Sequence, residues 1–579
     1  MAGPNGSPEP RSALSICRPA LLSVVVFSLF INLLMLTGPL FMLQIYDRVL
    51  ASGSIPTLMA LTLLVGVLYA LYGFLEFVRS RVVARVARVA EESLRERVFD
   101  AVAYHAVHQT PDTRTQPILD LQTLRQFLQS QGPFAFLDMP WTPLYLLVIY
   151  LMHPVLGIVS SLAVVLLVVI TFVNERVTRR HLLQSYRAVQ RATIVSDESR
   201  ANAEVATVLG MVGAIRRRWL TAQDESLDSQ MRAGDRGGML TSLSRALRLM
   251  FQSLILAVGA YLAVKQQISP GTMIAASILM SRALAPVEMA VAQWGAFQGC
   301  RQAWTRIKAC LKNTPHNQLR MDLPAPRGHV TVENLTAFAP GANKQILSNI
   351  NFDLPAGSGL GIIGPTGAGK STLARAIVGA WPAMRGTVRL NGAAMNQWDP
   401  AALGAYLGYL PQQVELFDGT VAENISRFSA DPDAGAIVRA AEEASVHDLV
   451  LKMPDGYNTE ISEGGARLSA GQRQRIGLAR ALYGEPTLVV LDEPNSNLDA
   501  EGESALVQAM ASVRERGGTV IVVAHRPSAI SVLDQLMMIK DGQIVAFGPK
   551  DEVLRKVMAR PVEVPRRSEP MTAVAKGRA

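Results

Sequence analysis

GIIGPTGAGKSTLARAIVG, residues 361–379, decides the fold of the carboxyl-terminal part of this chain. An apolar run, a glycine-rich turn and an amphipathic run follow one another, which predicts a buried strand, a loop and a helix. The turn fits the spacing G-x-x-x-x-G-K-S/T over residues 364–371. In such a loop the backbone N–H groups cradle phosphates, the lysine neutralises them and the serine hydroxyl ligates Mg²⁺. We therefore expect a phosphate-binding loop for a nucleoside triphosphate.

The expected nucleotide contacts comprise the whole turn and the first residues of the helix: Gly364, Pro365, Thr366, Gly367, Ala368, Gly369, Lys370, Ser371 and Thr372. Around this loop, short β-rich runs such as HVTVENL, TLVVLDEP and GTVIVVAH alternate with helical runs from residue 329 onward. The alternation predicts an α/β domain with a largely parallel central sheet.

Two carboxylates end the apolar run TLVVLDEP at residues 487–494. We expect Asp492 to hold Mg²⁺, commonly through water, and Glu493 to polarise the attacking water as general base. Acidic pairs after strands also cap helices, but the upstream phosphate loop and the downstream NSNLD make that the lesser interpretation. His525, which closes TVIVVAH, is expected to reach the γ-phosphate, and Gln412 in YLPQQ to sense Mg²⁺ and the water.

A second phosphate seat is predicted at LSAGQRQR, residues 468–475. Small residues precede a helical run there, so free N–H groups and a positive dipole end should point outward. The expected contacts are Ser469, Gly471 and Gln472. One nucleotide rarely needs two seats so far apart in sequence, which raises the question of whose phosphate the second seat binds.

The first 300 residues have a different composition. Apolar residues make up 49% of the chain and charged residues 18%, and long uncharged runs fill its amino-terminal half. We expect six membrane spans, near residues 21–45, 56–78, 134–152, 155–174, 249–266 and 271–294. Only His153 and Pro154 separate the third span from the fourth, which predicts a tight helical hairpin. The first run is too long for a signal-peptide core, so we interpret it as a retained span.

Arginines set the expected orientation. They are concentrated in the connections at 79–133 and 174–248 and are almost absent from those at 46–55 and 153–154. By the positive-inside rule both long connections and both termini are cytoplasmic. The net charge of +9 mostly reflects this topology, with a basic tail added. We expect no nucleic-acid partner, because basic residues interleaved with aromatics on a soluble face are missing.

Several segments are expected outside the cores. Residues 1–20 and the basic tail 559–579 are predicted to be flexible, and a proline-rich linker at 320–328 separates a membrane domain, 21–320, from the α/β domain, 328–558. Short helices near 118–128 and 202–213 are expected either to contact a soluble domain or to take part in ordinary interhelical packing. An odd number of cysteines, Cys17, Cys300 and Cys310, favours free thiols.

The ordered set of motifs from the phosphate loop to His525 resembles the nucleotide-binding domain of ABC transporters over residues 328–555. The resemblance implies ATP and Mg²⁺, and it answers the question about the second seat: Ser469 and Gly471 should grip the ATP of a partner subunit, which implies a homodimer. Two positions depart from the pattern. Ala470 replaces the usual glycine, and the expected adenine-stacking aromatic, Phe338, lies one place early. Glu463 resembles the loop that contacts the membrane helices.

The membrane half resembles a narrower group. FMLQIYDRVLASGSIPTLMALT (41–62) and FLDMPWTPLYLLVIYLMHPVLG (136–157) are similar to the ABC components of type I secretion systems, especially protease and lipase exporters. The expected fold is then a six-span exporter-type membrane domain followed by an ABC nucleotide-binding domain, without the peptidase-like domain of some relatives.

The same resemblance implies an ATPase in the bacterial inner membrane, with its nucleotide-binding domain in the cytoplasm. Its expected cargo is an unfolded polypeptide with an uncleaved C-terminal signal, and its expected partners are a periplasmic adaptor and an outer-membrane channel. A lipid or small-molecule exporter is the alternative, and an ATP-gated scaffold without turnover is a more distant one.

Charged residues within the spans leave alternatives open. Asp138 could face a transport pathway, or lie at the membrane interface with Trp141 in the aromatic belt, which we favour slightly. Arg282 and Glu288 in the sixth span could form an ion pair across the cavity.

Overall fold

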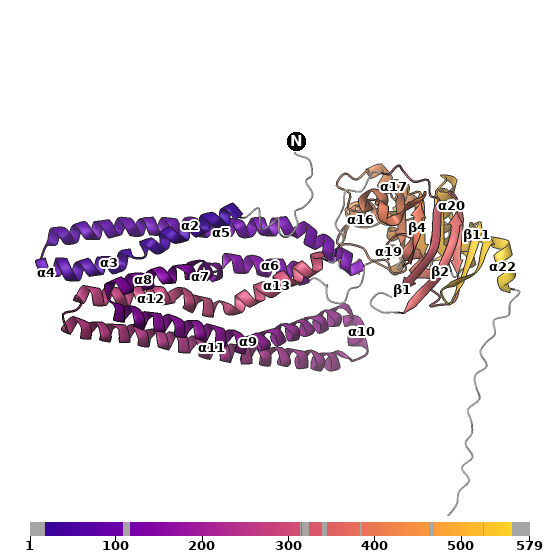
Figure 1. The fold of residues 1–579 in the computed structure, drawn as a ribbon. Coiled ribbons are helices and arrows are strands. Elements are labelled where there is room, and N and C mark those ends of the chain that lie inside the picture. The colour runs from indigo at the N-terminus through magenta and orange to yellow at the C-terminus, as the bar shows by residue number, and fades with distance from the viewer. Residues whose placement is uncertain are drawn as a thin grey trace, which may run out of the picture. The chain divides into compact units, whose positions relative to one another are not determined.

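The computed structural model describes residues 18–107, 116–312, 314, 323–338, 344–381, 385–462, 465, 468–524 and 526–558. The chain divides into two compact units, one built from residues up to 314 and one from residue 315 onward, with residues 105–111 grouped with the second. In the first unit the described residues form helices and turns, and the second unit mixes helices with strands (Figure 1). The tail 559–579, residues 1–17 of the predicted flexible segment 1–20 and residues 320–322 of the expected linker lie outside the described residues, whereas residues 18–20 begin a helix.

Six helical segments of the described chain are long and apolar enough to cross a membrane. They are Arg18–Ser52, Ile55–Val107, Gly132–Met152, Pro154–Val173, Gly238–Val264 and Pro270–Ala292. The predicted number and order of spans are therefore confirmed. The helices of this unit are α2 (Arg18–Leu34), α3 (Thr37–Gln44), η1 (Ile45–Val49), α4 (Leu50–Ser52), α5 (Ile55–Val107), α6 (Gln116–Gln129), α7 (Gly132–Asp138), η2 (Met139–Trp141), α8 (Thr142–Met152), α9 (Pro154–Ala201), α10 (Ala203–Val208), α11 (Val212–Val264), α12 (Pro270–Ala292) and α13 (Trp294–Lys312).

The predicted hairpin between the third and fourth spans is present. Helix α8 ends at Met152 and α9 begins at Pro154, with His153 extended between them. Proline suits the first helical position because its missing N–H would be unpaired there. The His153 imidazole accepts a hydrogen bond from the Val155 N–H at 3.3 Å, which caps α9.

The first span, predicted near residues 21–45, is present over Arg18–Ser52 and consists of several helical segments. Helix α2 ends at Leu34, α3 begins at Thr37, and one π-helical turn, η1, follows. The Asp47 carboxylate in that turn accepts hydrogen bonds from the Ser269 hydroxyl and, at 2.9 Å, from the Gly271 N–H. These donors lie at the start of α12. The π-helical turn therefore places the negative charge of Asp47 at the amino terminus of α12, where the helix dipole favours it.

Beyond the spans, α5, α9 and α11 continue as long helices, and α9 and α11 pack side by side (Figure 1). Helix α6, predicted near 118–128, packs against α13. Asp120 pairs with Arg306 at 2.6 Å, and Leu121 is buried with Ile307 and Cys310. For α6 the interpretation as interhelical packing is therefore confirmed. Cys300 and Cys310 are buried and form no disulfide within the described residues, and burial raises the pKa of Cys300 to about 11.

The second unit is built on two main sheets. A six-stranded sheet has the order β12-β11-β3-β10-β9-β6, parallel except for β12, and an antiparallel sheet has the order β2-β1-β4-β5. Its strands are β1 (Val330–Phe338), β2 (Gln345–Leu354), β3 (Gly359–Ile363), β4 (Arg385–Leu390), β5 (Ala393–Ala394), β6 (Leu407–Leu410), β7 (Gly419–Thr420), β8 (Glu460–Ile461), β9 (Leu488–Asp492), β10 (Thr519–Val523), β11 (Gln535–Lys540) and β12 (Gln543–Pro549). The predicted α/β domain with a largely parallel sheet is confirmed.

The helices of this unit are α14 (Lys370–Ile377), η3 (Met395–Gln397), α15 (Pro400–Tyr406), α16 (Val421–Ile425), α17 (Ala434–Glu443), α18 (His447–Leu451), η4 (Gly456–Asn458), α19 (Ala470–Leu482), α20 (Ala500–Glu515), α21 (Pro527–Ile530) and α22 (Lys550–Met558). Strands β3, β9 and β10 are almost wholly buried, as their continuous apolar runs require in a sheet covered on both faces. The carboxyl ends of β3, β9 and β6 meet at one edge, so the turns that follow them come together.

Candidate nucleotide-binding and catalytic site

The phosphate loop leaves the carboxyl end of β3 and enters α14 at Lys370. Glycine is required at two of its positions. A Cβ at Gly364 would collide with the carbonyl oxygen of Ile539, and Gly369 has φ +100°, where a Cβ would lie 2.7 Å from Leu347. The sequence therefore gives the loop a backbone that only glycine adopts without strain. This leaves backbone N–H groups at the start of a helix, where an anion is favoured.

Lys370 lies beneath the loop, 6% exposed. Its Nζ donates hydrogen bonds to the carbonyl oxygens of Gly364 and Pro365, both at 2.9 Å. Burial lowers the pKa of Lys370, and the nearby Glu493 and Asp492 carboxylates oppose that shift. The ammonium group is thus held against the loop by neutral acceptors, and its positive charge can act on a phosphate.

Ser371 and Asp492, the two residues expected to hold a divalent cation, lie next to each other. The Ser371 hydroxyl donates to Asp492 Oδ1 at 2.9 Å, which joins the start of α14 to the end of β9. Asp492 is fully buried, and its Oδ2 has no hydrogen-bond partner. Burial raises the pKa of Asp492, partly offset by the Ser371 hydrogen bond. A buried, unpaired carboxylate oxygen beside a hydroxyl is the kind of donor set that Mg²⁺ prefers, so the residues fit the ion.

Glu493 and Gln412 meet at the same edge of the sheet. Gln412 follows β6, Glu493 follows β9, and the Gln412 Nε2 donates to Glu493 Oε2 at 2.9 Å. Glu493 has φ +51°, and its N–H donates to the Val523 carbonyl oxygen at 3.1 Å. A non-glycine residue in the left-handed region is strained and must be held by its surroundings, a feature that is frequent at functional sites. The structure thus brings the two predicted residues into direct contact.

The second seat is the amino terminus of α19. The Ser469 hydroxyl accepts from the Gln472 N–H at 3.2 Å, and the Gln472 side chain accepts from the Ser469 N–H at 2.9 Å, a reciprocal capping box. Ala470 is the first residue of the helix, so its methyl group is compatible with the backbone there. At Gly471, by contrast, a Cβ would lie 3.0 Å from the Asn497 carbonyl oxygen.

Three residues singled out from the sequence lie outside the described residues: Cys17, Glu463 and His525. Phe338 ends β1. Gln474, one turn beyond the second seat, was not singled out from the sequence. Its side chain is 1% exposed and bonds to the segment that follows Glu493. A polar residue at an inward-facing position of an amphipathic helix was the available signal.

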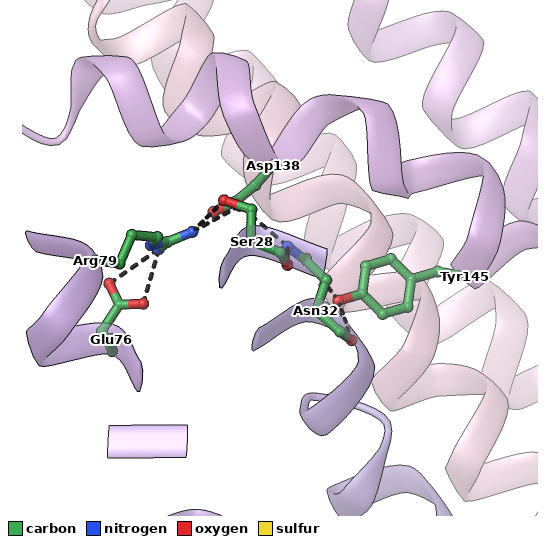
Figure 2. Close-up of polar contacts among 6 residues, drawn as sticks. All are labelled: Ser28, Asn32, Glu76, Arg79, Asp138 and Tyr145. Carbon is green, nitrogen blue, oxygen red and sulfur yellow. Dashed lines mark hydrogen bonds and ion pairs between the residues drawn. The ribbon is translucent and has the colours of Figure 1, made fainter. Parts of the chain in front are cut away.

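A second set of polar residues, buried or half-buried, lies in the membrane unit, and Figure 2 shows how its side chains converge. The Arg79 guanidinium on α5 donates to Asp138 at 2.8 Å, to Ser28 at 3.1 Å and to both oxygens of Glu76. Asn32 on α2 also donates to Asp138, at 3.0 Å, and accepts from the Tyr145 hydroxyl at 2.8 Å. The cluster joins α2, α5, α7 and α8.

This arrangement gives two charged residues of the spans a partner. Asp138 is ion-paired with Arg79. Glu288, considered above as a partner of Arg282 across the cavity, pairs with Arg248 on α11 at 2.8 Å. Sequence spacing could not reveal either partner, since both pairs join residues on different helices.

Comparison with known families matches both units. The family described as "ABC transporter transmembrane region" matches residues 21–287, and the family described as "ABC transporter" matches residues 347–496. A solved structure of a bacterial Atm1-family ABC exporter with ATP bound superposes with a TM-score of 0.82 at 22% identity, covering 94% of this chain and 97% of that one. That likeness concerns the fold.

Relatives narrow the family further. The chain is 46% identical over 570 residues, 98% of each protein, to the type I secretion system ATP-binding protein PrsD of Rhizobium meliloti (strain 1021). It is 27% identical over 551 residues to the leukotoxin translocation ATP-binding protein LktB of Mannheimia haemolytica, covering 93% of this chain and 77% of that one. The chain therefore belongs to the ABC transporters, in the family of type I secretion system ATP-binding proteins.

Proposed function

We propose that this protein is the membrane-embedded ATPase of a type I secretion system and exports an unfolded polypeptide with a C-terminal signal across the bacterial inner membrane. The observation that carries the proposal is the 46% identity that extends over 98% of both this chain and a type I secretion protein. The two membrane stretches at 41–62 and 136–157 support it, because nothing in ATP chemistry requires them. A periplasmic adaptor and an outer-membrane channel are the proposed partners.

The proposed chemistry assigns a role to each residue at the edge of the sheet. Residues 364–372 bind the phosphates, and Lys370 neutralises their charge. Glu493 accepts the proton of the attacking water. Gln412 donates a hydrogen bond to the Glu493 carboxylate and so orients that carboxylate. Ser371 and Asp492 hold Mg²⁺, which when bound neutralises charge on the phosphate oxygens. We propose His525 as a γ-phosphate contact and Phe338 as the adenine-stacking residue.

The second seat belongs to the ATP of a partner chain in the proposed homodimer. A hydroxyl group has one donor and two acceptor positions. The Ser469 oxygen accepts from Gln472 within the capping box, so its O–H hydrogen is still able to donate to a phosphate oxygen. Gly471 lies at the amino terminus of a 13-residue helix, and its lack of a side chain lets the backbone approach the phosphate. The helix dipole favours the phosphate because it is an anion.

A comparison of the proteins that the source bacterium secretes with and without this gene tests the export proposal. Deleting the gene should remove at least one protein from the culture supernatant, and the intact gene should restore it. A Lys370→Ala variant, which membranes should contain at the normal level, should fail to restore it. Mass spectrometry of the supernatant and immunoblots of the membrane fraction give both readouts.

The purified protein in liposomes separates protein export from lipid export. A C-terminal peptide of the missing protein should stimulate ATP hydrolysis, whereas a scrambled peptide of equal composition should not. An unchanged supernatant, together with stimulation by lipids alone, would contradict the proposal and favour a lipid exporter.

A further inference from the structure

The side chain of Gln474 connects two parts of the nucleotide-binding unit that the sequence separates by 20 residues. It is 1% exposed and lies one turn beyond the second seat on α19. Its Nε2 donates to the Pro494 carbonyl oxygen at 2.9 Å, and its Oε1 accepts from the Asn497 amide at 3.5 Å. Pro494 directly follows Glu493, so this hydrogen bond holds the residue next to the proposed general base.

Two further contacts fix the same segment to the same helix. The Asn497 carbonyl oxygen lies 3.0 Å from the position that a Cβ on Gly471 would take. Arg475 pairs with Asp499 at 2.6 Å. Helix α19 therefore touches residues 494–499 at three points. Close packing and buried hydrogen bonds of this kind transmit small displacements, because a packed interior is not compressible.

Glu493 is sensitive to such a displacement. It has φ +51°, and its backbone N–H is bonded to Val523 on β10, so its position depends on the peptides on either side. A shift of Pro494 by a fraction of an ångström would turn the Glu493 carboxylate relative to the attacking water. Misplacement of about 1 Å costs about 100-fold in rate.

We propose that Gln474 is a positioning residue that couples the second seat to Glu493 of the same chain. This inference rests on the proposed function, in which the seat binds one ATP of the dimer and Glu493 acts on the other. Phosphate binding at the seat moves the start of α19, Gln474 carries the movement to Pro494, and Glu493 is aligned. Each chain thereby links the two ATP sites, and hydrolysis is cooperative in ATP.

The test replaces Gln474 in the full-length protein and measures two quantities that a general loss of stability would not separate. For Gln474→Leu we expect unchanged ATP affinity, a 10- to 100-fold lower kcat and a Hill coefficient for ATP that falls toward 1. Asn497→Ala, at an exposed position, removes the weaker of the two Gln474 hydrogen bonds, together with an exposed one to Ser496, and should shift both quantities less in the same direction. The Asn497→Ala variant replaces Gln474→Leu as the test if the latter does not fold.

The matched control is Thr519→Val at the opposite end of β10. Thr519 is fully buried, and its hydroxyl donates to the Gly328 carbonyl oxygen at 2.7 Å and accepts from the Gly357 N–H at 3.1 Å. The control loses buried hydrogen bonds without touching α19, so it should retain cooperativity.

Equal Hill coefficients in the Gln474→Leu variant and the parent, or a coefficient of about 1 in the parent, would overturn the inference. Secretion by the parent would continue in either case, so failure of the inference is distinct from failure of the proposed export function.

Discussion

Lys370 and Arg79 are both buried cations, 6% and 3% exposed, but their surroundings differ. In the membrane unit, Arg79 bonds to the carboxylates of Asp138 and Glu76 (Figure 2). Its guanidinium group also lies over the Phe134 ring, 4.6 Å from the ring centroid. In the nucleotide-binding unit, Lys370 bonds to two backbone carbonyl oxygens and, among the described residues, to no carboxylate.

The difference separates a structural charge from a functional one. A buried charge that the protein neutralises itself fixes helices relative to one another, and removing one partner is costly. A buried charge that has only neutral acceptors can be neutralised by a bound ligand of opposite charge. The nearby Asp492 Oδ2, which has no hydrogen-bond partner, can likewise bind a cation. We expect substitutions in the first set to change stability and those in the second to change catalysis.

The largest expected effect is on catalysis. Glu493→Gln removes the proposed general base and should lower kcat by about 100- to 10,000-fold while ATP still binds. Phosphate release and binding of a fluorescent ATP analogue measure the two quantities. Glu515→Gln, an exposed carboxylate of the same unit, is the control and should behave like the parent. Hydrolysis by Glu493→Gln at the parental rate would show that another group is the base.

The next largest effect is on the stability of the membrane unit. Arg79→Met leaves two carboxylates without their partner and should destabilise by about 3–5 kcal/mol. Neutralising them as well, with Glu76→Gln and Asp138→Asn added, should recover much of that loss. Thermal midpoints of the detergent-solubilised protein compare the single and triple variants. If the triple variant is no more stable than the single one, the charges are not the reason for the loss.

A smaller effect is expected where the first span meets α12. At Gly271 a Cβ would lie 2.6 Å from the Asp47 carboxylate, so Gly271→Ala should cost about 1–3 kcal/mol. Gly73→Ala on α5 is the matched control, because no atom lies within 4 Å of its added Cβ, and alanine favours a helix. Equal thermal midpoints of the two variants would argue against the carboxylate cap.

The smallest expected effect is a dependence of stability on pH. Burial raises the pKa of Asp492, so between its ordinary pKa and the raised one the folded protein binds more protons than the unfolded protein. The contribution of Asp492 to stability therefore falls as pH rises through this window. The asparagine side chain of the Asp492→Asn variant does not titrate in this window. The free energy of unfolding of this variant relative to the parent should therefore increase with pH, measured in buffer that contains a chelator and no nucleotide. A constant difference would contradict the assigned burial effect.

Much of the fold could be predicted because its signals are local. Six apolar runs define the spans, since their length alone matches a bilayer. In the second unit, apolar runs that end in a glycine-rich loop or in Asp492 and Glu493 place those residues at strand ends. A parallel sheet brings strand ends to one edge, and the pairing of β6 with β9, which the structure shows, then places Gln412 beside Glu493.

What the sequence determined by itself is therefore the number of spans, the α/β class and the residue types at the nucleotide site, because each depends on short-range pattern. Only the tertiary structure decided that Asp138 pairs with Arg79, that Glu288 pairs with Arg248 and that Gln474 reaches Pro494. These partners lie 20 to 59 residues apart in sequence. Which charges and amides meet is set by how helices pack, and no local spacing encodes that choice.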